Sequence, residues 1–352
     1  MYNLRKKYYC IDLFKFLAAF LIASIHISPV ISYGVFPDFL LRNYFARIAV
    51  PYFFVASGFF LFQKISLRDF DKTIFTAYAK KILKFYVIWS VIYLPWNLKN
   101  RIFPLEKNFV LEMLDLIREI LFVGYGQFWY LHATIVAVLL IMLCFKFRLP
   151  LQITFFISFC LYLIGLVPQS YTGLLDLIRN APFLWNALKV VQGIMTTTRN
   201  GIFDGFFFMT LGALFSKMPH IRISLKKAVV GFFCSMILLL VEALFLNAIH
   251  WSKDYNMYLF LIPATYFLFC ISIQIDLKES TIYPTLRVLS FLIFSLHTFI
   301  NPFISTGMEL FFHNDCSALR YVGTMTVTIL ASVLILQLSR TKKFSWLKNL
   351  YQ

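Results

Sequence analysis

Three residues that could do chemistry lie inside the first apolar segment of the chain. These are Asp12, Lys15 and His26. Ionisable side chains are costly in a membrane interior, so each marks a candidate functional site. Lys15 and His26 are 11 residues apart, about 16 Å along a helix and close to three turns, which places both on one helix face. Asp12 and Lys15 are i,i+3 neighbours that can pair.

Histidine is the side chain best suited to take a proton from a hydroxyl near neutral pH. His26 is therefore the candidate general base. The structural alternative is that His26 bonds a neighbouring helix and that Lys15 extends to the nearer membrane surface.

Other polar residues interrupt the later apolar segments and could line a substrate cavity. For each of them a structural role is the alternative: packing at a proline kink, the aromatic belt of a membrane interface, or a hydrogen bond between helices. Glu242 has no partner in its own segment, so we expect it to meet a polar group elsewhere or to line a cavity. Arg199 can pair with Asp204 to hold the chain entry, or bind a carboxylate or phosphate from outside. The cavity candidates are Arg47, Ser57, Trp129, Tyr130, His132, Arg199, Asn200, Glu242 and His297.

The composition indicates an integral membrane protein. The 352 residues are 60% hydrophobic and only 14% charged, whereas soluble domains carry about 25% charged residues. The net charge is +17, but the basic residues form short clusters between apolar runs, which membrane insertion selects. A nucleic-acid partner is therefore not expected. The six cysteines form no C-x-x-C pair, so no metal site is expected.

Helices that cross a membrane need about 20 apolar residues. The sequence predicts ten such helices, with the second and sixth the weakest. With the N-terminus in the cytoplasm, 21 Lys and Arg fall on the inner side and 11 on the outer side. This bias predicts that both termini are cytoplasmic. The predicted helices cover 11–32, 48–64, 82–98, 127–145, 150–168, 201–216, 228–249, 257–275, 288–305 and 321–338.

The predicted fold is thus an all-α integral membrane protein of about ten transmembrane helices. Its membrane domain covers residues 1–340, and a basic cytoplasmic tail covers 341–352. Two outer connections are long. Residues 99–126 have the spacing of a short amphipathic helix on the membrane surface, and residues 169–200 form a loop that could shape an external site.

Several motifs together resemble the family 3 membrane acyltransferases. They are Asp12-x-x-Lys15-x10-His26, Phe53-Phe-Val-Ala-Ser57-Gly58-Phe, Trp129-Tyr130-Leu131 and Leu296-His297. The resemblance implies a membrane enzyme that moves an acyl group, commonly acetyl from acetyl-CoA, to a hydroxyl of an extracytoplasmic glycan. It places His26 in acyl transfer, with Lys15 where the family has an arginine on the acyl-CoA side. Lysine cannot grip a phosphate through two parallel hydrogen bonds, but it remains a point charge.

Within that family, four stretches resemble the membrane half of the membrane-bound serine/alanine racemases of vancomycin-type resistance. Those proteins carry a soluble racemase domain after the last span. Here the last predicted span ends near Leu338, so we expect a stand-alone relative or a fragment. The four stretches are Asp12-Leu-Phe-Lys15, Ile25-His26-Ile-Ser28-Pro29, Ala46-Arg47-Ile-Ala-Val-Pro51 and Thr198-Arg199-Asn200-Gly201.

Three functions are therefore weighed. The first is an O-acyltransferase of the bacterial plasma membrane, with acyl-CoA and a cell-envelope polysaccharide or small hydroxylated acceptor as partners in the lipid bilayer. In it Asp12 and Lys15 organise the inner entrance for the acyl donor, and Arg47, Trp129 and Arg199 shape the outer mouth. The second is a transport or binding domain for L-serine, whose carboxylate would pair with Arg199. The third is a structural or assembly role. A homodimer is compatible with each.

Overall fold

All regular secondary structure of the computed structural model is helical within the residues it describes. Those residues are 7–67, 71–99, 108–175, 180–183, 185–186, 197–312 and 316–352, and none of them forms a strand. The chain divides into two compact units. The first contains residues 1–56, 220–240 and 260–352, and the second contains 57–219 and 241–259.

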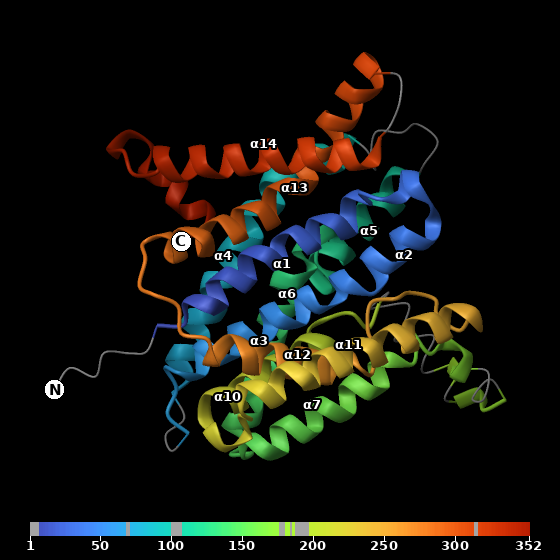
Figure 1. The fold of residues 1–352 in the computed structure, drawn as a ribbon, viewed down its shortest axis with the longest axis vertical. Helices are drawn as coiled ribbons and strands as arrows, with labels where there is room; N and C mark the ends of the chain where they lie inside the picture. The colour runs from blue at the N-terminus through green and yellow to red at the C-terminus, as the bar shows by residue number, and fades with distance from the viewer. Residues whose placement is uncertain are drawn as a thin grey trace. The chain divides into compact units, whose positions relative to one another are not determined.

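The first unit is built around a parallel helix pair, α1 (Tyr9–Ile27) and α13 (Ile282–Phe312), with α14 (Ser317–Leu338) packed on α13 (Figure 1). Small residues of α1 let the backbones approach closely. Ala19 and Ala23 are fully buried against Ile293 of α13 in a cluster that Met325 of α14 completes. This packing fixes the direction in which the polar side chains of α1 face.

The remaining elements of the first unit are shorter, and α3 and α11 contribute residues to both units. The 3-10 turn η2 precedes α3 and packs on α1 and α12. These elements are η1 (Ile31–Tyr33), α2 (Val35–Asn43), η2 (Phe45–Ile48), α3 (Ala49–Phe62), η8 (Pro219–Ile221), α11 (Leu225–Ala248), α12 (Leu261–Gln274) and η9 (Lys342–Leu350).

The second unit packs around α6, which contacts α4, α7, α10 and the π-helical turn η7. Polar side chains join its helices where two of them cross: Ser158 Oγ lies 2.7 Å from Thr210 Oγ1, and both are buried. The elements are α4 (Lys72–Asn97), α5 (Phe109–Arg118), η4 (Glu119–Val123), η5 (Gly126–Phe128), α6 (Trp129–Lys146), α7 (Leu151–Leu166), η6 (Thr172–Leu174), η7 (Gly201–Gly205) and α10 (Phe206–Lys217).

Every predicted span coincides with a helix, although several ends differ. Six helical stretches of the described chain are long and apolar enough to cross a membrane, and α7 and α12 are shorter apolar helices. The chain is therefore a multi-pass membrane protein. The count of ten crossings and the cytoplasmic termini remain predictions. The six stretches are Tyr9–Ile27, Val35–Phe62, Phe109–Lys146, Leu225–Ala248, Ile282–Leu310 and Ser317–Leu338.

The two long connections that the sequence predicts on the outer side are described only in part. The short helix expected within residues 99–126 forms as α5, with Phe109, Leu111 and Leu114 exposed. Residues 100–107 of this connection, and residues 176–179, 184 and 187–196 of the second one, lie outside the described residues.

Gly58 in α3 marks a close approach between two helices of the second unit. A Cβ at this position would lie 2.0 Å from the backbone oxygen of Met209 in α10. We expect Gly58→Ala to lower the free energy of unfolding by about 3 kcal/mol or more, because backbone must move to admit the methyl group. Gly307 in α13 meets no atom within 4 Å, so Gly307→Ala should instead stabilise by about 0.5–1 kcal/mol. Thermal unfolding of both variants in detergent checks this, and equal shifts would contradict the close approach.

Candidate functional site

An ion pair joins the N-terminal parts of α1 and α13. Asp12 is buried, and its two carboxylate oxygens accept hydrogen bonds of 2.7 and 2.6 Å from Nε and Nη2 of Arg287. Asp12 therefore pairs with Arg287 rather than with Lys15, the possible partner that the i,i+3 spacing offered. Asp12 faces α13, where the planar guanidinium can engage both oxygens at once, which an ammonium cannot do.

A polar clamp lies beside this pair, at the start of both helices. The hydroxyl of Tyr9 donates a 2.8 Å hydrogen bond to Glu279, and Lys7 forms an ion pair with the same carboxylate. Together these two donors lower the pKa of the Glu279 carboxyl, because both stabilise its ionised form. The clamp and the ion pair fix the register of α1 against α13.

Lys15 has a different neighbour. It is half-buried, and its Nζ lies 5.3 Å from the centroid of the Phe53 ring in α3. A cation over an aromatic face is stabilised electrostatically without losing its charge. Lys15 thus lies beside Phe53, one turn further along α1 than Asp12, which Arg287 engages.

Two imidazoles meet near the C-terminal end of α1. The ring centroids of His26 and His297 are 5.3 Å apart, with the planes tilted by 45°. His297 is fully buried, whereas His26 is exposed. The Nδ1 atom of His297 lies 2.9 Å from the backbone oxygen of Ile293. A carbonyl can only accept, so this contact assigns the proton to Nδ1 and leaves Nε2 as the acceptor of a neutral ring. Within the described residues, Nε2 has no hydrogen-bond partner.

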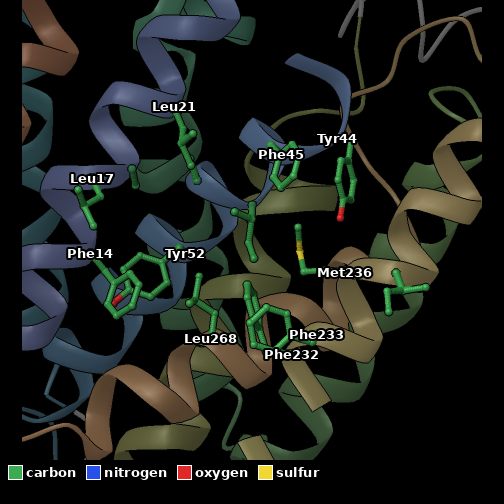
Figure 2. Close-up of a pocket in the computed structure, with 14 residues that line it drawn as sticks. Phe14, Leu17, Leu21, Tyr44, Phe45, Tyr52, Phe232, Phe233, Met236 and Leu268 are labelled. Carbon is green, nitrogen blue, oxygen red and sulfur yellow. The ribbon is translucent and has the colours of Figure 1, made fainter. Parts of the chain in front are cut away.

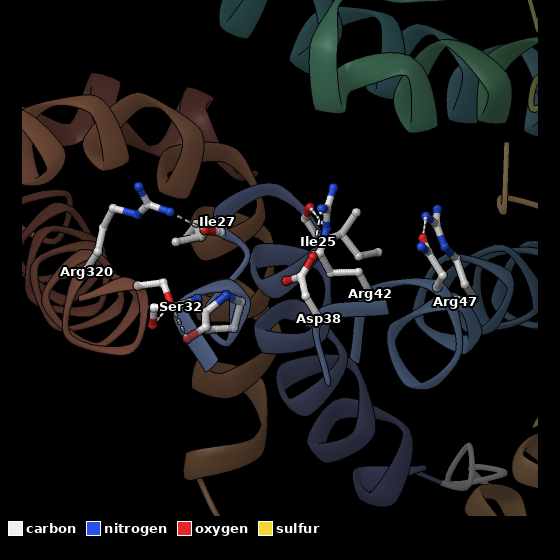
Figure 3. Close-up of polar contacts among 10 residues, drawn as sticks. Ile25, Ile27, Ser32, Asp38, Arg42, Arg47 and Arg320 are labelled. Carbon is white, nitrogen blue, oxygen red and sulfur yellow. Dashed lines mark hydrogen bonds and ion pairs between the residues drawn. The ribbon is translucent and has the colours of Figure 1, made fainter. Parts of the chain in front are cut away.

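Arginines hold the helix end on both sides of His26 (Figure 3). Arg42 Nε donates to the backbone oxygen of Ile25, and Arg320 Nη2 donates to that of Ile27, each at 2.9 Å. The last carbonyls of a helix lack internal partners and favour cations. The two guanidinium groups supply the missing hydrogen-bond donors and the positive charge, so the backbone that carries His26 is held in place. Arg42 is itself held by Asp38 at 3.1 Å.

A serine contact ties the start of α14 to the chain that leaves α1. Ser317 Oγ donates to the backbone oxygen of Pro29 at 2.9 Å and lies 2.7 Å from Ser32 Oγ. On the neighbouring turn, Arg47 Nη2 donates to the Asn43 side chain at 2.7 Å. His26, His297 and Arg47 all lie in the first unit, and Arg47 contacts Asn43 rather than either imidazole in the contacts described here.

Sequence reasoning missed three arginines of this region, Arg42, Arg287 and Arg320, because it counted them only as loop charges. One signal was available for Arg287. It precedes His297 by ten residues on one helix, repeating the order of an ionic residue and then an imidazole that Asp12 and His26 show on α1.

A second polar cluster lies in the second unit around Arg199. The guanidinium carbon is 4.6 Å from the centroid of the Trp129 ring, and Nη1 donates to Asn256 at 3.0 Å. Asn256 in turn donates to Gln169 at 3.2 Å. The Arg199–Asp204 pair considered from the sequence does not form; no carboxylate of the described chain lies within ion-pair distance of Arg199. The Asn256 amide and the face of the Trp129 ring contact Arg199 instead.

Asn200 and Trp129 owe their positions to local backbone geometry. The Asn200 side chain accepts from the backbone N–H groups of Ile202 and Phe203 at 2.9 and 3.2 Å, which caps the helical turn η7. Gly124 adopts a φ of 91°, and a Cβ there would lie 2.5 Å from the Trp129 Cα. Only glycine suits this turn, which brings Trp129 to the start of α6.

The other cavity candidates of the second unit have structural partners. Tyr130 and Ser57 have their hydroxyls 3.1 Å apart, and His132 Nε2 lies 3.0 Å from the Leu121 backbone oxygen. Buried Glu242 accepts from the Tyr171 hydroxyl at 2.5 Å and from the Leu259 backbone N–H at 2.7 Å. Glu242 thus meets polar groups outside its own helix.

Comparisons with known proteins agree on one family. A family model described as an acyltransferase domain matches residues 8–337. An amino-acid racemase of Enterococcus faecalis is 30% identical over 78% of this chain and 37% of its own length. A serine/alanine racemase of Enterococcus gallinarum is 29% identical over 96% of this chain and 47% of its own. The chain therefore spans less than half the length of these relatives. No solved structure matches it.

Proposed function

Because the chain belongs to the family 3 membrane acyltransferases, we propose that it moves an acyl group, acetyl in the simplest case, from acyl-CoA to a hydroxyl of an extracytoplasmic glycan or similar acceptor. The observation that carries this proposal is the pair of imidazoles at the held end of α1, where His26 is exposed and His297 is buried behind it. A base oriented by a second group is the arrangement that activates a hydroxyl.

In the proposed reaction His26 takes the proton from the acceptor hydroxyl. The oxygen attacks the thioester carbonyl carbon, a C–O bond forms and the C–S bond breaks. The CoA thiolate leaves with the bonding electrons and takes up the proton that His26 removed. His297 is assigned a positioning role, because its buried ring packs against the His26 ring, with the two centroids 5.3 Å apart.

Lys15 is the proposed cation for the acyl donor. Asp12 is neutralised by Arg287, which leaves the Lys15 ammonium over Phe53 as the nearest free point charge on α1. CoA carries phosphates that a lysine can attract without the directional fork of arginine. His26 then lies about 16 Å further along the helix, so donor and acceptor would approach from opposite membrane faces.

Sealed membrane vesicles of defined orientation test this arrangement. Labelled acetyl-CoA is supplied on one side only, and label in the acceptor fraction is counted. Transfer is expected when the labelled acetyl-CoA is on the cytoplasmic side. Vesicles from cells that lack the protein, treated in the same way, give the blank. Transfer that requires donor on the opposite side would contradict the proposed roles of Lys15 and His26.

The second candidate function is recognition of L-serine. It is favoured by Arg199, whose partners are Trp129 and Asn256 rather than a carboxylate, and by the relative named a serine/alanine racemase. A guanidinium in this setting can take a substrate carboxylate through two parallel hydrogen bonds.

Under that function we expect Arg199→Gln to reduce uptake of labelled L-serine by proteoliposomes at least tenfold, since a charged hydrogen bond contributes about 1.5–3 kcal/mol. Arg199→Lys keeps the charge but cannot form two parallel hydrogen bonds to a carboxylate. Its serine uptake should lie between that of Arg199→Gln and that of the parent protein. Arg118→Gln, on the exposed surface of α5, is the matched control. Parent protein that accumulates no serine would exclude this candidate and leave the acyltransferase proposal intact.

A further inference from the structure

A basic segment folds back onto the end of α14, at the red end of the chain in Figure 1. The 3-10 stretch η9 contacts α14, and its residue Leu347 is buried. The hydroxyl oxygens of Ser339 and Tyr351 lie 2.6 Å apart, which joins the residue that caps α14 to the chain just after η9. The segment is therefore an ordered part of the first unit, held at the end of the helix.

Four cations of this segment are exposed and have no acidic neighbour in sequence. Residues 316–352 contain no Asp or Glu. None of the four cations forms an ion pair with a carboxylate of the described residues. Their charge is therefore uncompensated within that part of the chain, and a negatively charged partner would complement it. The four exposed cations are Arg340, Lys342, Lys343 and Lys348.

An indole lies in the same segment as these cations. Trp346 is 60% exposed, although its neighbour Leu347 is buried. Tryptophan is enriched where a membrane meets water, because its ring is apolar and its N–H is polar. Helix α14 is long and apolar enough to cross a membrane and ends at Leu338, two residues before Arg340. The four cations and Trp346, which we call the basic surface, therefore lie where α14 leaves the hydrocarbon.

The apolar cavity of the first unit carries no comparable signal. It lies among α1, the η2 turn, α11 and α12, and Figure 2 shows Met236 and Leu268 in its lining. Of the described residues that line it, none is charged, so the lining does not distinguish one lipid head group from another. The basic surface does, because cations near the membrane surface attract anionic lipids over zwitterionic ones.

We propose that the basic surface binds the head groups of anionic phospholipids in the leaflet where α14 ends. Four or more basic residues directly after a membrane helix attract such lipids electrostatically, and the exposed indole suits the same depth of the membrane. A membrane is the partner that the position favours, because the surface begins two residues after an apolar helix. The inference goes beyond acyl transfer and serine recognition, and it depends on neither.

Fluorescence of Trp346 reports which lipid lies beside the basic surface. The full chain and Trp346→Phe are each placed in nanodiscs of equal amounts of phosphatidylglycerol and phosphatidylcholine, and the difference between their emission spectra is the signal of Trp346. Bromine on the acyl chains of one lipid quenches an indole nearby. We expect bromine on phosphatidylglycerol to quench this signal about fivefold more than bromine on phosphatidylcholine, the effect of one basic residue near an anionic surface.

Two charge variants with matched changes complete the test. The triple variant Lys342→Gln/Lys343→Gln/Lys348→Gln removes three exposed charges of the basic surface and should remove most of the difference between the two lipids. The control variant replaces three exposed lysines of α4 in the second unit and should keep that difference. Its changes are Lys80→Gln, Lys81→Gln and Lys84→Gln.

Three results would overturn the proposal. Equal quenching by both lipids in the parent would show that the basic surface does not select anionic lipid. No quenching by either lipid would place Trp346 away from the membrane. Equal losses of the lipid difference in the two triple variants would show that the net charge of the protein, and not this surface, attracts the lipid.

Discussion

Replacing His26 with alanine should reduce acyl transfer by about 100- to 10,000-fold, the range that a general base contributes. His26 is exposed at the end of α1, and no other imidazole of the described residues except His297 stacks near it. His297 is fully buried, so it cannot reach an acceptor in its place. The measurement is the initial rate of label transfer from acetyl-CoA to the membrane acceptor fraction.

Two companion variants give this prediction its controls. His220→Ala removes an exposed histidine of the η8 turn and should leave the rate unchanged. His297→Gln should lower kcat while KM for acetyl-CoA stays near that of the parent, because a positioning residue acts on the base and not on donor binding. A His26→Ala protein that is folded and keeps more than half of the parent rate would refute the role of His26.

Breaking the Asp12–Arg287 pair should produce a large loss of stability. Asp12→Asn removes the charge that compensates the guanidinium and leaves a buried amide in place of a carboxylate that accepts two hydrogen bonds. We expect a loss of about 2–3 kcal/mol, which is below the roughly 3–5 kcal/mol for breaking a fully buried pair, because the Arg287 side chain is 56% exposed. Denaturation followed by circular dichroism in detergent measures the change.

The exposed Asp115–Arg118 pair on α5 is the matched control. Both of its side chains are about 40% exposed, so Asp115→Asn should cost less than about 1 kcal/mol. The double variant Asp12→Asn/Arg287→Gln removes both charges and should recover part of the loss. Equal destabilisation by Asp12→Asn and Asp115→Asn would show that the α1–α13 ion pair does not hold these helices together.

The helices were predictable because their signal is local. Runs of apolar residues locate α1, α6, α11 and α14 to within a few residues. Helix ends were less accessible: α4 begins at Lys72, ten residues before the predicted start, because its first turns are polar and Asp71 caps them. The sixth span begins with the π-helical turn η7, where Gly201, Asp204 and Gly205 weaken the apolar pattern that the prediction relied on.

The candidate site was predictable in its residue types but not in its pairings. Lys15 is the nearest cation to Asp12 along the chain, yet the partner is Arg287, 275 residues away. Likewise Asp204 is close to Arg199 in sequence, but Arg199 donates its hydrogen bond to Asn256. The i,i+3 and i,i+4 spacings predict which side chains are neighbours on the surface of one helix, but not which side chains of another helix they meet. Which helix faces that surface depends on packing, here on the alanines of α1 that admit α13.

The most direct test of acyl transfer uses the purified protein in nanodiscs with acetyl-CoA. Thermal stabilisation reports donor binding, and release of free CoA reports cleavage of the thioester, each compared with His26→Ala. We expect acetyl-CoA to stabilise both proteins and only the parent to release CoA. No stabilisation at millimolar acetyl-CoA, or equal CoA release by the two proteins, would contradict it.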